Sequence, residues 1–211
     1  MGQAALQLPM SAEDFLVWDA TQTVKHEYLR GEVFPWGGAD ELFGMAGAGE
    51  AHATVAGNLY IALRQHLAGS PCRTFITDMK LRVEAANAFF YPDVMVTCSV
   101  ADTTDPLVKR EPVLVAEVLS PATAAYDLGA KFVAYRQIPT LREYLVIDPQ
   151  TRRCDLYRKG QGEGDDGLWV LHPAEPGQPV CLDSVGLQLA PAALWAEVPL
   201  VAGLNRAAIP E

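Results

Sequence analysis

A single carboxylate inside an apolar segment constrains this chain more than any other feature of its sequence. Residues 113–119 read VLVAEVL, in which Glu117 interrupts an otherwise continuous apolar run. Such a run is typical of a strand that is covered on both faces of a sheet. An isolated ionised carboxylate buried there would be strongly destabilising. Glu117 is therefore expected to be protonated, paired with a cation or bound to a metal.

The residues that follow this strand predict a strand–helix–strand unit. Residues 122–138 have a helical apolar pattern, and residues 143–147 return to the pattern of an apolar strand. Four side chains share the predicted buried stripe of the helix: Ala125, Leu128, Phe132 and Tyr135. A unit of this length favours a right-handed parallel crossover. The fold class predicted from these patterns is mixed α/β, with a central sheet of five or six strands.

Several upstream segments add to this expectation. Turn residues and alternating patterns predict a hairpin at 26–34 that turns at Arg30-Gly31, a helix at 51–68, and strands at 79–83 and 89–98. Two glycine-rich segments, 37–49 and 160–167, are expected to be loops. The first of them does not have the spacing of a phosphate-binding loop.

Length and composition favour one domain. The chain has 211 residues, of which 50% are hydrophobic, enough for one sizeable core. We expect a single domain at 11–198 between tails at 1–10 and 199–211. No apolar run approaches the ~18 residues of a membrane-spanning helix, and the first ten residues do not resemble a secretory signal. A cytoplasmic protein with four reduced cysteines is the resulting expectation.

A second carboxylate and a lysine are candidates to meet Glu117. Asp93 follows Pro92 at the start of an apolar strand, and two carboxylates on neighbouring strands would repel unless a divalent cation such as Mg²⁺ joined them. The alternative is a structural salt bridge and a turn-capping aspartate. Lys131 lies one helical turn after Asp127 and one before Tyr135, so it could reach back to Glu117. A surface pair with Asp127 is the alternative for this lysine.

Several ordered motifs resemble the Uma2 family, a family of bacterial restriction-endonuclease-like proteins with the PD-(D/E)xK fold. The matching segments are YPDV at 91–94, AEVLSP at 116–121, Asp127…Lys131…Tyr135, and EYLVIDP at 143–149. Upstream, Glu27 in HEYLRGE and His52 at the start of a helix match as well. The resemblance implies a restriction-endonuclease-like fold, a central mixed sheet flanked by helices, over roughly residues 10–198.

The resemblance also implies roles for individual residues. Asp93 and Glu117 would be ligands of Mg²⁺ or Mn²⁺, Glu27 would complete the acidic cluster, and Lys131 would be the catalytic lysine. The general nuclease motif has lysine two positions after the glutamate, where this chain has Leu119, so Lys131 would replace it from the helix. His52 and Tyr135 are candidates for contact with the substrate. The alternatives are a surface or capping role for His52 and core packing for Tyr135.

These observations predict a magnesium-dependent DNA endonuclease. DNA could approach a basic stretch that includes Arg152 and Arg153, although the alternative there is a solvated hairpin. The net charge of −10 argues against non-specific coating of nucleic acid. A homodimer is expected if both strands are cut. The alternative function is a catalytically inactive nuclease-fold module that binds DNA or self-associates.

Overall fold

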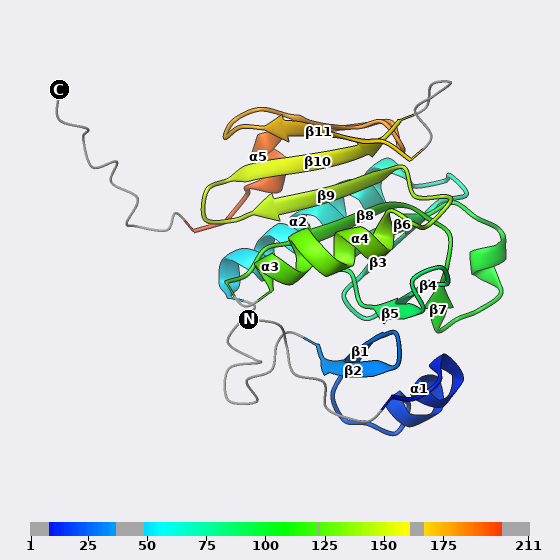
Figure 1. The fold of residues 1–211 in the computed structure, drawn as a ribbon. Helices are drawn as coiled ribbons and strands as arrows, with labels where there is room; N and C mark the ends of the chain where they lie inside the picture. The colour runs from blue at the N-terminus through cyan, green and yellow to red at the C-terminus, as the bar shows by residue number, and fades with distance from the viewer. Residues whose placement is uncertain (1–8, 37–48, 122, 161–166, 200–211) are drawn as a thin grey trace.

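The computed structural model describes residues 9–36, 49–121, 123–160 and 167–199. Its largest element is a six-stranded sheet with the order β11-β10-β9-β8-β6-β3 (Figure 1). The strands are β3 (Arg73–Ile76), β6 (Val94–Thr97), β8 (Pro112–Val118), β9 (Glu143–Asp148), β10 (Arg153–Lys159) and β11 (Trp169–Ala174). Strands β8 and β9 are parallel, as predicted, and every other neighbouring pair in this sheet is antiparallel.

A second sheet of five strands has the order β2-β1-β5-β4-β7. Its strands are β1 (His26–Leu29), β2 (Glu32–Pro35), β4 (Lys80–Val83), β5 (Ala88–Phe90) and β7 (Val108–Lys109). The predicted hairpin is confirmed by the pairing of β1 with β2. Arg30 and Gly31 both have positive φ, 53° and 98°, as a tight two-residue hairpin turn requires. This second sheet was not predicted.

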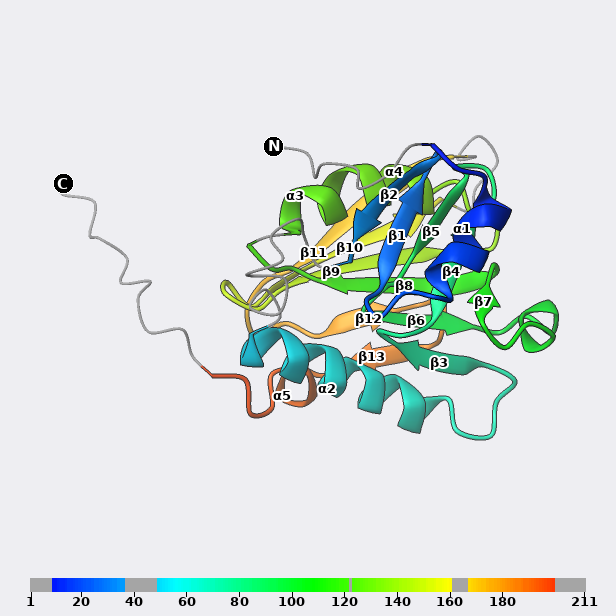
Figure 2. The ribbon, with the colours of Figure 1, turned by 90° about the horizontal axis from the view of Figure 1, so that it is seen from below.

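Helices cover both faces of the larger sheet (Figure 2). Helix α2 (Glu50–His66) lies on one face, close to the predicted range, and a broken helix connecting β8 to β9 lies on the other. The remaining elements are α1 (Ala12–Asp19), η1 (Ala101–Thr103), β12 (Val180–Leu182), β13 (Leu187–Leu189) and α5 (Pro191–Leu194). None of the helices in the described ranges combines the length and apolar character that a membrane crossing requires.

The core explains the apolar run of β8. Leu114, Ala116 and Val118 pack in the cluster that includes α2, whereas Val115 packs in the cluster on the opposite face. Successive side chains of a strand point to opposite faces, so β8 is covered on both, as predicted. Glu117 is on the face of Val115, toward the broken helix.

The predicted strand at 89–98 is in fact two strands in different sheets. Strand β5 belongs to the smaller sheet and β6 to the larger one, and residues 91–93 connect them. Pro92 lies in this connection and has no N–H to donate to a ladder, which accounts for the break. Asp93 is therefore at the junction of the two sheets.

The predicted helix at 122–138 is shorter and irregular. It consists of α3 (Ala124–Tyr126), a π-helical turn, η2 (Asp127–Lys131), and α4 (Phe132–Tyr135). The predicted apolar stripe is wrong at Ala125, which is exposed, and at Leu128, which is 44% exposed, whereas Asp127 and Lys131 are buried. A π-helical turn contains more residues than an α-helical turn, so residues before and after it do not share one face at the 3.6-residue period.

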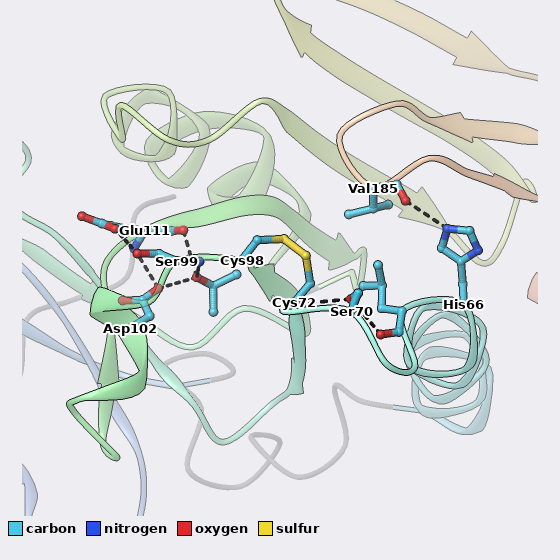
Figure 3. The surroundings of a disulfide bond; sticks show 10 residues. His66, Ser70, Cys72, Cys98, Ser99, Asp102, Glu111 and Val185 are labelled. Carbon is cyan, nitrogen blue, oxygen red and sulfur yellow. Dashed lines mark hydrogen bonds between the residues drawn. A yellow bond between two sulfur atoms is a disulfide. The ribbon is translucent and has the colours of Figure 1, made fainter.

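The expectation of four reduced cysteines is also wrong. Cys72 and Cys98 form a disulfide that joins the start of β3 to the end of β6 (Figure 3). Arg73 pairs with Thr97, so the register places the two cysteines next to each other. Cys154 and Cys181 are free thiols. Burial raises the pKa of Cys154 to about 12. Most of the predicted loops at 37–49 and 160–167 and of the predicted tail at 199–211 lies outside the described residues.

Candidate active site

The candidate site lies where β5, β6 and β8 meet. Val94 pairs with Ala116, so Asp93 and Glu117 occupy adjacent positions on neighbouring strands. The Asp93 backbone N–H donates to Glu117 Oε2 at 3.3 Å, and the Val118 N–H donates to Asp93 Oδ2 at 2.8 Å. Each carboxylate is thus held by the backbone of the other's strand, side by side as predicted.

Lys131 approaches this pair from the broken helix. Its Nζ donates to Glu117 Oε1 at 3.2 Å, which confirms the predicted approach of Lys131 to Glu117. The same Nζ lies 3.2 Å from Glu27 Oε1. Leu119, at the position where the general motif has lysine, uses its backbone N–H to bond Ile147 O instead. The amine near Glu117 is therefore supplied by the helix and not by the strand.

Glu27 reaches the cluster from the smaller sheet. It is on β1, is 3% exposed, and accepts a hydrogen bond from the Tyr91 N–H at 3.3 Å. Tyr91 is two residues before Asp93, so the same connection positions both carboxylates. The predicted membership of Glu27 in the acidic cluster is confirmed by this placement, although its role in catalysis stays a prediction.

Asp127 is a third carboxylate on Lys131, which sequence reasoning did not place in the site. Its Oδ1 lies 3.1 Å from Lys131 Nζ, in an ion pair without hydrogen-bond geometry. The spacing of four residues between Asp127 and Lys131 indicates an ion pair on one helix face, but it is equally compatible with a pair on the surface. The burial of Asp127 to 2% exposure decides between the two.

Tyr135 holds the carboxylate of Glu117 by a hydrogen bond. Its hydroxyl donates to Glu117 Oε1 at 2.8 Å, and the side chain is completely buried. The ring also packs edge-on against Phe90. A buried tyrosine whose hydroxyl is already engaged orients the carboxylate and does not face solvent, so the predicted substrate contact has no support from this placement.

His52 lies at the partly exposed side of the site. It projects from the first turn of α2, and its Nε2 is 3.2 Å from Asp93 Oδ2. Burial acts to lower the pKa of His52, but the hydrogen bond and the negative charge of Asp93 outweigh burial and raise this pKa. The predicted substrate contact of His52 remains a prediction, and its position beside Asp93 is compatible with it.

The predicted basic stretch is engaged elsewhere. Arg152 donates to Val198 O, and Arg153 pairs with Asp155 at 2.9 Å. In the strand register, Arg153 of β10 is opposite Asp148 of β9, and β10 is two strands away from β8. Both arginines are at the same end of the sheet as Glu117, but neither contacts the acidic cluster.

Burial and charge together perturb the ionisation of the cluster. Burial raises the pKa of Glu117 well above its usual value, and burial raises that of Glu27 as well. Burial acts to lower the pKa of Lys131, but its three carboxylate neighbours outweigh burial and raise this pKa well above its usual range. Lys131 is therefore an ammonium at neutral pH and partly neutralises the surrounding carboxylates.

The donor set at the junction fits a hard divalent cation. Asp93 and Glu117 offer carboxylate oxygens, and Mg²⁺ is commonly bound by one or two carboxylates with waters and substrate phosphates completing the shell. Among the described residues, no group of three or more His, Cys, Asp or Glu side chains is arranged to hold a metal. A metal here would consequently depend on water and substrate for its other ligands.

Comparison with known proteins agrees with this class of fold. A crystal structure of a "putative nuclease belonging to DUF820" from Anabaena variabilis superimposes with a TM-score of 0.66. The alignment covers 89% of this chain and 98% of that one, at 15% sequence identity. The molecule thus has a mixed α/β fold of the restriction-endonuclease-like class.

The family model of Uma2, described as "Putative restriction endonuclease", matches residues 12–192. The chain belongs to the Uma2 family.

Two curated relatives extend over most of the chain. The Synechocystis protein slr1290 is 33% identical over 181 residues, covering 86% of this chain and 88% of the relative. The protein sll1609 of the same organism is 34% identical over 164 residues, covering 77% and 85%. Both are described only as uncharacterized proteins.

Proposed function

We propose that this protein is a metal-dependent endonuclease that hydrolyses phosphodiester bonds in DNA. The observation that carries this proposal is the meeting of Asp93, Glu117 and Lys131 at the junction of two sheets in a chain of a nuclease-like family. Asp93 and Glu117 would hold Mg²⁺ or Mn²⁺. When bound, such an ion polarises the phosphate and activates a water.

The protein's own residues prepare the site for this chemistry. Tyr135 and Lys131 fix one oxygen of Glu117, which leaves Oε2 directed toward the backbone of Asp93. Lys131 keeps positive charge beside the place where a phosphate would gain negative charge, which favours the transition state electrostatically. His52 contacts Oδ2 of Asp93, the oxygen that also accepts from the Val118 N–H, and so helps to orient this carboxylate.

A nicking assay on supercoiled plasmid tests the proposal. The wild-type protein is expected to nick with Mg²⁺ or Mn²⁺ and not with EDTA, and Asp93→Asn should reduce nicking by at least about 100-fold. Asp183→Asn is the matched control, because this carboxylate is exposed and pairs with Arg158, which is not a residue of the cluster. Equal nicking by the wild type and Asp93→Asn would indicate a contaminant and defeat the proposal.

One observation favours a second candidate, a non-catalytic nuclease-fold module that binds DNA or self-associates. The Lys131 ammonium is surrounded by three carboxylates, so its positive charge is already compensated by groups of the protein in this arrangement. Calorimetric titration with Mg²⁺ or Mn²⁺ separates the candidates. Metal binding that is lost in Asp93→Asn supports the enzyme, whereas no binding together with no nicking supports the module.

A further inference from the structure

A lysine and a tryptophan lie opposite each other beside the candidate site. Lys25 immediately precedes β1 and Trp36 immediately follows β2, and the Trp36 backbone N–H donates to Lys25 O at 3.0 Å. The two residues thus extend the hairpin by one more pair at its open end. Lys25 Nζ lies 3.8 Å from the centroid of the Trp36 ring, a cation–π contact that holds the ammonium in place.

This pair is connected directly to the residues of the site. The Trp36 indole N–H donates to Tyr91 O at 3.4 Å, and Lys25 Nζ is 5.5 Å from the Tyr91 ring. Tyr91 in turn donates its N–H to Glu27 and lies two residues before Asp93. Lys25 therefore lies beside the connection that carries the candidate metal ligand.

Lys25 can exchange its charged partner for a ligand. Its side chain is 29% exposed, and it pairs at 2.7 Å with Asp78, whose side chain is 82% exposed. Its other hydrogen bond, to Thr77 O, is long at 3.4 Å. An exposed ion pair of this kind contributes little to stability, so a phosphate can replace it easily. Lys80 also lies near the Tyr91 ring, at 5.3 Å. It is held instead by Asp19, whose side chain is 3% exposed, and is less available.

We infer that Lys25, supported by Trp36, binds a backbone phosphate of DNA next to the bond presented to Asp93 and Glu117. The inference rests on the proposed function, because it takes DNA as the substrate. An ammonium is a compact charge that binds phosphate oxygens without requiring one orientation. A cation beside an aromatic ring is also a recurrent surface for nucleic acid strands. The contact would position DNA without reading its sequence.

Fluorescence anisotropy with a labelled DNA duplex in EDTA tests the inference without cleavage. Lys25→Ala should weaken binding by about 3- to 10-fold, and the slope of log K against log salt should become shallower by about 1. Lys25→Arg should restore most of the affinity because the positive charge is kept. Thermal unfolding, monitored by circular dichroism, confirms that each variant is folded.

Arg73→Ala is the matched control. Arg73 is exposed, and it pairs with Thr97 at the end of β6 away from Asp93, so its removal should leave both affinity and slope unchanged. An equal loss in the Arg73 and Lys25 variants would mean a non-specific charge effect and overturn the inference. So would a loss in Arg153→Ala without one in Lys25→Ala, and so would the absence of binding by the wild type.

The two proposals fail in different assays. If the wild type nicks plasmid and Lys25→Ala binds DNA as tightly as the wild type does, the phosphate contact is refuted and the nuclease remains. If DNA binding depends on Lys25 but no metal supports nicking, the phosphate contact is supported and the nuclease is refuted.

Discussion

Lys131 is a buried ammonium whose removal would leave three carboxylates without their cation. Its side chain is 6% exposed, and those of Glu27, Glu117 and Asp127 are 3–4% exposed. Breaking a buried ion pair from one side typically costs about 3–5 kcal/mol. We therefore expect Lys131→Ala to lower the free energy of unfolding by about this amount at pH 8, measured by urea denaturation. Arg136→Ala, which removes an exposed cation, should change it by less than about 0.5 kcal/mol.

The effect of pH on this loss has a defined sign. The pKa of Lys131 is raised on folding, so its contribution to stability is fully present below about pH 10.4 and is lost only above that value. In Lys131→Ala, the buried carboxylates have lost their cation. Their pKa in the folded protein therefore lies further above the value of about 4 that they have in the unfolded chain. Such groups disfavour folding as pH rises. The difference between wild type and variant should therefore be smaller at pH 5 than at pH 8, and an unchanged difference would contradict this electrostatic account.

At the scale of single elements, the π-helical turn η2 determines which side chains reach the site. It buries Asp127 and Lys131 while Leu128, one residue further along, is turned toward solvent. Gly129 is in the middle of this turn and has no positive φ. Apart from its chain neighbours and the backbone of its own helix, no atom lies within 4 Å of the position that a Cβ would occupy.

Gly129→Ala should therefore stabilise the protein. Alanine restricts the unfolded chain and favours helical backbone, for a gain of about 0.5–1 kcal/mol. Thermal unfolding monitored by circular dichroism measures the gain, and Gly177→Ala serves as a control because Gly177 has a φ of 87° that alanine adopts only with strain. A loss of stability in Gly129→Ala would show that the turn requires glycine.

The same elements show how far the sequence could be interpreted. The apolar run around Glu117 predicts a strand covered on both faces, because burial on two sides leaves a direct compositional signal. The position of Glu27 came from family resemblance, since contacts between distant segments have no local signal. The broken helix could not be predicted from periodicity, because a 3.6-residue period does not hold across a π-helical turn. Strands β5 and β6 are both apolar and are separated by three residues, so the pattern predicts one strand, although Pro92 lies at the break between the sheets.

At the scale of the whole molecule, the disulfide fixes an edge strand of the larger sheet. Strand β3 is at the edge and pairs only with β6 in that sheet. The bond joins cysteines 26 residues apart, and the chain-entropy relation gives about 3.5 kcal/mol for a loop of this length. We expect the double variant Cys72→Ala and Cys98→Ala to lose about this much stability in urea denaturation.

A reducing agent provides an independent check of this value. Dithiothreitol should destabilise the wild type by a similar amount and leave the double variant unaffected. Cys181→Ala is the control, because this cysteine is exposed and unpaired and its loss should not change the response. If dithiothreitol leaves the wild type as stable as before, the cysteines are not bonded in solution.

In covalent terms, the oxidised chain is a closed ring with two tails. The ring runs from Cys72 to Cys98 and carries Asp93. One tail supplies Glu27 and His52, and the other supplies Glu117 and Lys131. The site is assembled where the ring meets both tails, so a protease that cuts the chain once inside the ring would leave every one of these residues on a single covalent molecule until a reductant separates the pieces.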